Sequence, residues 1–276
     1  MAERRKRMNQ SHPLSAFWRF VRGLRDPETS GPLIVMYHGL GGADGLTARD
    51  FAQQCDRLAE LYTIVPLQVA VRSLGQPRAG SLAAITFDDG YQDFAELAAP
   101  ILQQRGMHAT LFVPAGQIGG HNQWDEGERP HRPILDGAGL RGLSREWVEV
   151  GAHGWSHCRM RNLTPEALRR ETQGAKQRLE EVLGYEVNLF AYPYGQLDDF
   201  DLHAQEAVRS AGFVAACSTH FGRASRQNER FRLRRVGVEP TDSFEVFEAK
   251  LRGDFDWVAY KERLGAWIRT LKTRED

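Results

Sequence analysis

Short apolar runs alternate with longer amphipathic stretches along most of the chain. The short runs are rich in β-branched and other apolar residues, and most are bounded by Gly, Pro or Asp, which is typical of buried strands. They span residues 33–37, 63–66, 83–87, 109–113, 148–152, 188–192, 213–217 and 233–238. The alternation of strand and helix patterns predicts an α/β fold built on a parallel sheet.

The longer stretches carry helix signals. Residues 47–61 place their apolar side chains on one helical face. A second helix is predicted to begin at Thr164, a capping residue followed by proline, and to end at Gly184. A third covers about residues 198–211. One stretch, residues 116–143, breaks this rhythm because it is rich in Gly, Pro, His and charge, and we expect a long loop that lines a site or lacks order.

Length and the terminal segments suggest one main domain with two extensions. The 276 residues suit a single barrel-sized unit. We therefore expect a catalytic domain over residues 31–240, a basic N-terminal extension over 1–30 and a helical C-terminal extension over 241–276. Within the first extension, residues 14–25 have apolar residues at helical spacing with interleaved arginines. This helix could lie on an anionic membrane surface, but packing against the barrel or a partner is the favoured reading.

Composition excludes some classes of function. Lys plus Arg and Asp plus Glu are equal at 36 each, which argues against a dedicated nucleic-acid binder. The three cysteines are too few and too widely spaced for a disulfide framework or a paired metal site, which favours a reducing compartment. The basic N-terminus is not followed by the apolar core of a signal peptide, and no run approaches the roughly 18 apolar residues of a spanning helix. We expect a cytoplasmic protein, with peripheral membrane association as the alternative.

Two adjacent carboxylates, Asp88 and Asp89, follow the strand predicted at 83–87. An unpaired carboxylate beside an apolar layer is costly, and a bound cation is the simplest compensation, although a solvated turn also accommodates Asp and Gly. His153 and His157 supply two imidazoles after a later strand. One carboxylate and two histidines form a three-ligand metal site with an open position, and the second carboxylate then remains as a base.

These residues lie in a pattern that predicts a single site. Asp88 and Asp89 follow one predicted strand, His153 follows another, and Tyr194 follows a third. In parallel α/β folds the carboxyl ends of the strands form one face, where ligands bind. We therefore expect side chains from these separate segments to converge.

Three motifs resemble those of the polysaccharide deacetylase family, and the resemblance covers about residues 33–238. They are Thr86-Phe87-Asp88-Asp89-Gly90, His153-Gly154-Trp155-Ser156-His157 and Phe190-Ala191-Tyr192-Pro193-Tyr194-Gly195. The third motif and the opening Val35-Met36-Tyr37-His38 are similar to the branch that contains the exopolysaccharide and poly-N-acetylglucosamine deacetylases. The resemblance implies a distorted (β/α) barrel with about seven parallel strands.

The resemblance also implies the roles of individual residues. A divalent metal, usually zinc, would be held by Asp89, His153 and His157. Asp88 would be the general base, and the backbone N–H of Tyr194 would help to hold the oxyanion. These roles are chemically reasonable, since an acetamide must be polarised, its attacking water deprotonated and its tetrahedral oxyanion stabilised.

The chain departs from the family pattern at two points. An arginine usually precedes the third motif and holds the catalytic aspartate, but none occurs here, and Arg235 is a candidate replacement or a substrate contact. A late Leu-x-His motif, whose histidine protonates the leaving amine, is also missing from the segment at 233–238. The general acid is therefore unassigned. His38 and His220 follow predicted strands and could reach the site face. For His38 we expect a role at the site, as a substrate contact, with a buried structural histidine as the alternative.

Other candidate substrate contacts lie near these motifs. Pro193 and Tyr194 form a rigid turn, and Trp124 lies in the long loop, where an indole face could stack on a sugar ring. For Trp155 we favour a role in anchoring the loop, and for Cys158 a role in packing.

We therefore predict a metal-dependent hydrolase that removes N-acetyl groups from amino sugars of a glycan or glycan precursor. An O-acetyl esterase, or a small-molecule amidase or deformylase, would use the same tetrahedral intermediate and stays open as an alternative. A sugar-binding protein without catalytic activity is a third hypothesis, motivated by the two missing family residues. Retention of Asp88 argues against it, since binding alone does not require this carboxylate.

Overall fold

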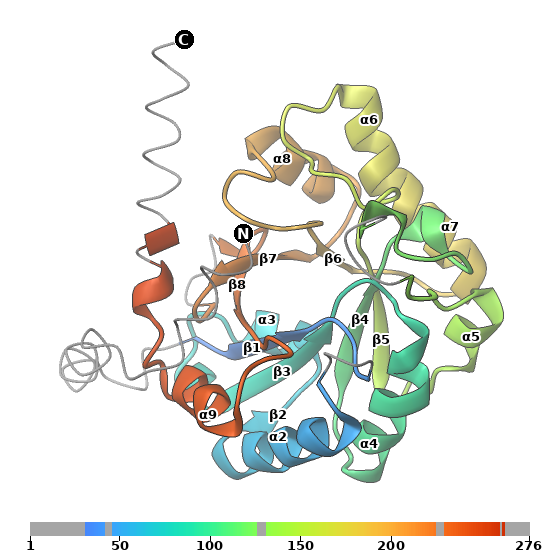
Figure 1. Cartoon of the computed structure of the whole chain (residues 1–276). Helices are drawn as coiled ribbons and strands as arrows, with labels where there is room; N and C mark the ends of the chain where they lie inside the picture. Colours follow the sequence, from blue (N-terminus) through green and yellow to red (C-terminus); the bar gives the residue numbers. More distant parts are fainter. Residues whose placement is uncertain (1–30, 42–45, 126–130, 225–228, 260, 263–276) are drawn as a thin grey trace.

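The computed structural model describes residues 31–41, 46–125, 131–224, 229–259 and 261–262. Its centre is a closed barrel of seven parallel strands surrounded by helices (Figure 1). The strands of the barrel are β1 (Leu33–Tyr37), β3 (Leu82–Phe87), β4 (Ala109–Val113), β5 (Val148–Ala152), β6 (Leu189–Ala191), β7 (Ala215–Phe221) and β8 (Leu233–Gly237). Strands from β3 to β8 pair in chain order, and β1 pairs with both β8 and β3, which closes the sheet. The predicted barrel of about seven strands is confirmed.

An eighth strand, β2 (Thr63–Ile64), lies outside the closed barrel. It pairs with the first two residues of β3, whereas β4 pairs with β3 only from Ile85 onward. Beyond Ile64 the chain turns at Pro66 into the next helix, so the predicted strand over 63–66 is shorter than expected.

Side chains along each strand alternate between the barrel interior and the surrounding helices, as the two-residue period of a strand requires. Interior positions form one small apolar cluster with the helix α3 (Leu67–Arg72). Members contributed by the strands are Ile34, Ala84, Phe112, Leu189, Ala191, Ala215, Cys217 and Leu233. Three of these eight are alanine, whose small side chains leave room for α3 to pack against the strands. The larger cluster fills the layer between the strands and the outer helices.

The outer helices confirm the predicted helix signals. They are α2 (Ala48–Leu61), α4 (Ala99–Gln104), α5 (Gly137–Gly142), α6 (Pro165–Arg169), α7 (Ala175–Leu183), α8 (Leu202–Ser210) and α9 (Phe244–Arg252). A π-helical turn, η7 (Arg170–Gly174), joins α6 to α7, so one helical run begins at the Thr164 cap and ends at Gly184 in the left-handed conformation, φ +75°. A second π-helical turn, η4 (Phe94–Ala98), precedes α4.

The stretch at 116–143 is more ordered than its composition suggested. It contains the short turn η6 (Gln123–Asp125) and the helix α5, which begins where the Asp136 side chain accepts a hydrogen bond from the Gly139 N–H at 2.7 Å. The N-cap signal at Asp136 outweighs the high glycine content of the segment. Residues 126–130 of this stretch lie outside the described part.

The N-terminal extension over 1–30 lies wholly outside the described residues, and the C-terminal extension is described only over 241–259 and 261–262. The helix predicted over 14–25 lies outside the described residues, as do the last predicted apolar positions of the C-terminal extension. In α9, Phe247 and Leu251 are buried in the larger apolar cluster. No helix in the described part of the chain combines the length and apolar character needed to cross a membrane.

Leu67→Ala should test the contribution of α3 to the barrel. Leu67 is 1% exposed in the interior cluster, so its truncation leaves a cavity, and we expect a loss of about 2–5 kcal/mol in the free energy of unfolding. Leu61→Ala, at a position 41% exposed, is the matched control and should change stability by less than about 0.5 kcal/mol. Urea unfolding of the two variants gives the comparison, and equal effects would contradict the packing role of α3.

Candidate metal and catalytic site

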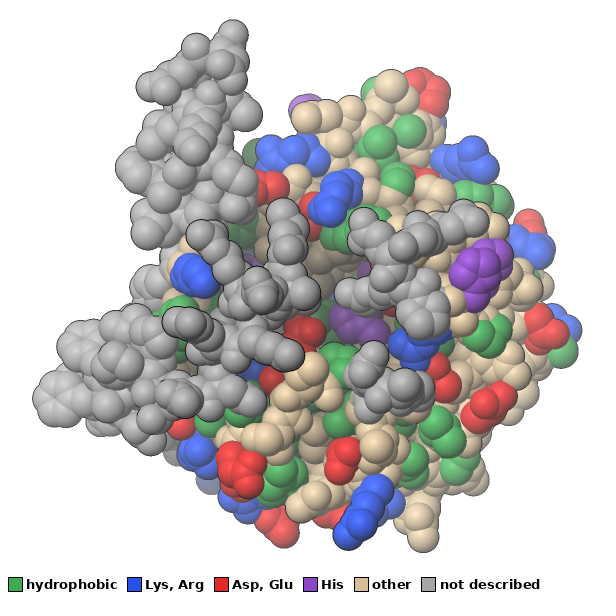
Figure 2. Space-filling model, viewed as in Figure 1, with side chains coloured by type: hydrophobic (Ala, Val, Ile, Leu, Met, Phe, Trp, Pro, Cys, Tyr) green, Lys and Arg blue, Asp and Glu red, His purple; other side chains and the backbone are tan. Residues whose placement is uncertain are grey.

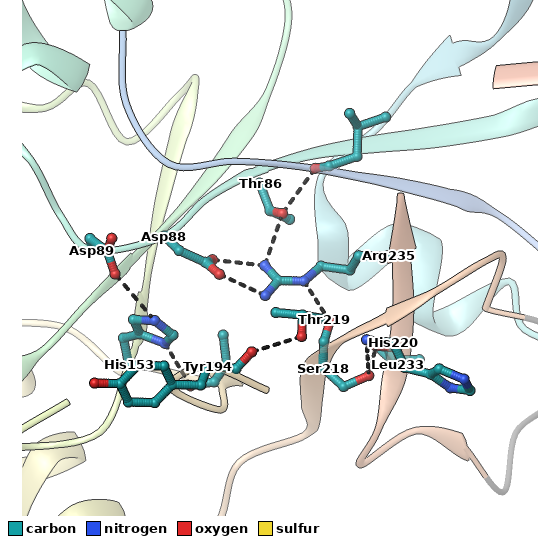
Figure 3. Close-up of polar contacts among 12 residues, drawn as sticks. Thr86, Asp88, Asp89, His153, Tyr194, Ser218, Thr219, His220, Leu233 and Arg235 are labelled. Atoms are coloured by element: carbon teal, nitrogen blue, oxygen red, sulfur yellow. Dashed lines mark hydrogen bonds and ion pairs between the residues drawn. The ribbon is translucent and has the colours of Figure 1, made fainter. Parts of the chain in front are cut away.

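The candidate residues lie together at the carboxyl ends of the strands (Figure 3). Asp88 and Asp89 follow β3, His153 follows β5, and Tyr194 follows β6. Asp88 continues the interior alternation of β3, so its carboxylate points into the mouth of the barrel. Acidic and histidine side chains lie side by side near the middle of this face in Figure 2.

Asp89, His153 and His157 form a cluster with the dimensions of a metal site. Their potential ligand atoms all lie within 4.8 Å of one another. Asp89 Oδ1 is 3.5 Å from His153 Nε2 and 3.2 Å from His157 Nε2. Bonds of about 2.0–2.1 Å in a tetrahedral zinc site place neighbouring ligands about 3.3 Å apart. The spacing of these atoms therefore fits a divalent cation.

The His153 ring is fixed by a hydrogen bond. Its Nδ1 lies 2.8 Å from the Ala191 carbonyl oxygen, which can only accept, so Nδ1 carries a proton and Nε2 is the nitrogen that faces Asp89. A histidine that binds a metal through one nitrogen usually donates its other N–H in this way. His153 is therefore prepared for a ligand role before any ion is bound.

The His157 ring is held by stacking. The Trp124 ring lies parallel to it at a centroid distance of 3.9 Å and an angle of 22°. Its buried Nδ1 has no hydrogen-bond partner among the described residues. The two histidines are thus oriented by different forces, one by a backbone carbonyl and one by an aromatic face.

Backbone strain is concentrated at this site. Asp89, His157 and Tyr194 all have positive φ values, at +74°, +61° and +59°. Such angles are uncommon for residues other than glycine and persist only where the surroundings enforce them. In each of the three motifs, one residue other than glycine is therefore held in the left-handed region.

Asp88 forms a bidentate ion pair with Arg235. The two guanidinium–carboxylate distances are both 2.7 Å, and neither side chain is more than marginally exposed. Arg235 Nε also donates to the Ser218 carbonyl at 2.9 Å, and Nη1 donates to Thr86 Oγ1 at 3.2 Å (Figure 3). Arg235 is 0% exposed and directs its guanidinium to Asp88, which matches the expectation that it holds Asp88 rather than the expectation of a substrate contact.

The ion pair keeps Asp88 ionised. Burial alone would raise the pKa of the Asp88 carboxyl, but the charges of Arg235, His153 and His38 outweigh burial and lower this pKa below its ordinary value. For Asp89, burial is likewise outweighed, here by hydrogen bonds from His153 and His157, and its pKa lies well below the ordinary value. Both carboxylates are therefore charged at neutral pH.

The two candidate acids occupy different environments. His38 continues the interior alternation of β1 beyond Met36 and is exposed, and its charge acts on both aspartates. This excludes the reading of His38 as a buried structural residue. His220 is 7% exposed, its Nε2 lies 3.4 Å from Glu262 Oε2, and its ring points away from Asp88 (Figure 3). His220 is therefore not brought to the site.

The turn after β6 presents one backbone donor. The Tyr194 carbonyl accepts the Thr219 hydroxyl at 2.7 Å, which ties the turn to β7. The Tyr194 N–H donates to none of the described residues. Tyr194 itself is 36% exposed, and its ring lies 5.1 Å from that of His157. Pro193 is buried at this turn, and its expected role as a substrate contact stays a prediction.

Of the remaining candidates, Trp124 lies at the site, whereas Trp155 and Cys158 lie outside the ligand cluster. Trp124 lies directly on His157, as described above, whereas Trp155 packs beside Gly116, where a Cβ would be 2.5 Å from Trp155 Nε1. Trp155 therefore occupies the anchoring position that we favoured. Cys158 is partly buried, and Asp89, His153 and His157 form the single metal-like cluster found in the described part of the chain, so Cys158 is not among its members.

One residue at the site escaped the sequence analysis. Glu171 is buried and accepts hydrogen bonds from residues 155 and 156, between the two histidines. A signal was present, because Glu171 falls on the same helical face as Leu168 and Ala175, where a charged residue requires a partner. The partner itself is more than ten residues away and is not apparent from local sequence.

Comparisons with known proteins show which family the chain resembles. The family model described as "Polysaccharide deacetylase" matches residues 75–216, about half of the chain. The YxkH protein of Bacillus subtilis strain 168, whose name places it provisionally among the polysaccharide deacetylases, is 27% identical over 222 residues, covering 78% of this chain and 74% of YxkH.

Two solved structures share the fold. The Streptococcus pyogenes deacetylase PplD, solved in complex with acetate, has a TM-score of 0.67 and 22% identity, covering 79% of this chain and 97% of PplD. IcaB from Ammonifex degensii has a TM-score of 0.67 and 23% identity, covering 82% of this chain and 97% of IcaB.

Arg235→Met should destabilise the protein in a pH-dependent way. The lowered pKa of Asp88 means that its stabilising contribution is present above the unfolded Asp pKa of about 4 and is lost as the pH falls below it. Without Arg235, burial raises this pKa instead, so the variant loses stability as the pH rises above about 4. We expect the difference from wild type to increase with pH and to reach about 3–5 kcal/mol near neutrality.

Urea unfolding of chelated protein between about pH 4 and pH 8 measures this difference. The double variant Asp88→Asn, Arg235→Met removes the titrating group and is the control. The difference between its free energy of unfolding and that of wild type should not increase above about pH 4. An Arg235→Met loss of equal size at every pH would show that the pairing with Asp88 is not its cause.

Proposed function

Because the chain belongs to the polysaccharide deacetylase family, we propose that it removes N-acetyl groups from an amino sugar in a glycan or glycan precursor, using a bound divalent cation. The observation that carries the proposal is the cluster of Asp89, His153 and His157 at metal-site spacing beside a second, ionised carboxylate, Asp88. Family membership makes the protein a hydrolase with a carbohydrate substrate. The N-acetyl position, the metal and the roles below are the proposed refinements.

Asp89, His153 and His157 would hold the cation, and zinc is the first candidate because two imidazoles and one carboxylate with an open position are a common zinc ligand set. When bound, such an ion polarises an acetyl carbonyl and lowers the pKa of water. Asp88 is ionised, lies beside the cluster and is not used as a ligand, so it would accept the proton of the attacking water. Its bidentate contact with Arg235 fixes the orientation of the carboxylate for that transfer.

Two further groups would complete the reaction. The Tyr194 N–H, held in a strained turn and without a described acceptor, would donate to the developing oxyanion. His38 would protonate the leaving amine, because it is the exposed histidine at the barrel mouth whose charge acts on both aspartates. This assignment supplies the acid that the missing late histidine leaves open.

The substrate class follows from the family and from the residues at the mouth. Trp124 and Tyr194 border the ligand cluster and offer aromatic surface to a sugar ring, as the resemblance to exopolysaccharide deacetylases suggests. Residues 31–240 would form the catalytic unit. Within the C-terminal extension, α9 packs on the barrel through Phe247 and Leu251.

Substitution of the aspartates should separate metal binding from catalysis. Asp88→Asn should lower acetate release from N-acetylated sugars by about 10²–10⁴-fold while zinc stays bound, because it removes the base and leaves the three metal ligands in place. Asp89→Asn and His153→Ala should lose both zinc and activity. Acetate release and zinc content are measured on the same preparations, after chelation and after zinc addition. A normal rate in Asp88→Asn would overturn the assignment of the base.

His38→Gln should reveal the acid through its dependence on the leaving group. An amine leaves only with a proton, so we expect a loss of about 10²–10⁴-fold on an N-acetyl substrate. An aryl acetate releases a stable phenolate that needs no acid, and its hydrolysis should be almost unaffected. Equal losses on the amide and the aryl ester would show that His38 is not the acid. Activity of the wild-type protein on O-acetyl sugars alone would favour an esterase.

A further inference from the structure

The segment between the two histidines is tied to a buried carboxylate that the proposed chemistry does not use. Glu171 lies on η7 and is 5% exposed. Its Oε2 accepts hydrogen bonds from the N–H of Trp155 at 2.7 Å and of Ser156 at 3.0 Å. Its Oε1 accepts the Ser156 hydroxyl at 2.7 Å. Three donors therefore converge on one carboxylate, directly before His157.

Gly154 provides the space for this contact. Its φ is +73°, a conformation that favours glycine. A Cβ at this position would lie 2.9 Å from Glu171 Oε2, closer than such atoms approach in proteins. Any other residue would strain the backbone and displace the carboxylate. The glycine and the serine between the two histidines are thus both accounted for by Glu171.

The helical run that carries Glu171 changes from α-helical to π-helical geometry around this residue. On η7 the ordinary α-helical hydrogen bonding is replaced by a π-helical turn, a feature that is often found at functional sites. The flanking residues Leu168 and Ala175 are buried in the apolar layer. A charged carboxylate at this depth is costly unless it is fully hydrogen-bonded, and residues 155 and 156 donate three hydrogen bonds to it.

His157 depends on this support more than His153 does. His153 has the Ala191 carbonyl to orient its ring, whereas the His157 Nδ1 has no described hydrogen-bond partner and its φ is +61°. A strained backbone persists only when its surroundings enforce it. The Glu171 contacts fix the two residues that precede His157 and so restrict the direction in which its Nε2 points.

We infer that Glu171 is a positioning residue for metal binding, which holds residues 154–156 so that His157 Nε2 faces Asp89. The inference rests on the proposed function, because the ion concerned is the one assigned to Asp89, His153 and His157. A contact that only stabilised the fold would affect thermal unfolding of the metal-free protein and would leave metal affinity unchanged. The two roles are therefore separable.

Glu171→Gln tests the inference with the smallest change of shape. We expect its zinc affinity to fall about 10–100-fold, the usual effect of losing a group that orients a metal ligand. Glu180→Gln is the matched control, since Glu180 lies on the same helical run and also accepts a backbone N–H, that of Val187 at 3.0 Å, away from the site. Its zinc affinity should equal that of wild type.

Zinc affinity is measured on the full chain by competition with a chromogenic chelator, and thermal unfolding is recorded on the metal-free proteins. Absorption of bound Co²⁺ reports whether the ligand geometry has changed. Weakened zinc binding and an altered Co²⁺ spectrum in Glu171→Gln, with both unchanged in Glu180→Gln, support the inference. Wild-type affinity in Glu171→Gln overturns it, even if that variant melts at a lower temperature.

Ser156→Ala provides a milder test if Glu171→Gln does not fold. Ser156 is exposed, and its substitution removes one of the three hydrogen bonds without burying a new group. We expect a smaller loss of zinc affinity at an unchanged melting temperature of the metal-free protein, and an unchanged affinity contradicts the inference. Failure of the wild-type chain to bind zinc would instead overturn the proposed function.

Discussion

Pairing of β1 with β3 is the constraint on which the site depends. In an open sheet, β3 and β8 would lie toward opposite edges, but the closed barrel makes both of them neighbours of β1. Interior side chains of β3 and β8 therefore meet across β1. This places Arg235 within hydrogen-bond distance of Asp88, although 147 positions separate them in the chain. The same closure gathers the ends of β5 and β6 around the same opening.

The buried carboxylates at this opening need partners of opposite charge. A carboxylate buried at the end of an apolar barrel needs a partner, and a buried pair is more valuable for orientation than for net stability. Asp88 has Arg235 as its partner. Asp89 lies against the two histidines, whose Nε2 atoms face it at metal-site distances. The cation that the proposal assigns to Asp89 would thus also satisfy an electrostatic requirement of the fold.

Rigidity at the site comes from several independent contacts. His153 is fixed by the Ala191 carbonyl, and the His157 ring is stacked on Trp124. Glu171 holds the backbone between these two histidines. Each contact keeps a strained or otherwise free group in one orientation, which is the condition for binding an ion without reorganisation. A helix on the outside of the barrel is in this way linked directly to the ligand cluster.

The sequence alone determined the elements whose signals are local. Short apolar runs predicted the strands, and because parallel strands end on one face, Asp88, Asp89 and His153 were predicted to converge. The tertiary structure decided which side chains pair with one another. Arg235 had an interior position on β8, but barrel closure selected Asp88 as its counterion. The sequence shows Glu171 as a charged residue on an apolar helical face. The hydrogen bonds that it accepts depend on a π-helical turn and on a loop that follows another strand. Local sequence specifies which groups a segment presents, whereas contacts between distant segments exist only once the barrel has closed.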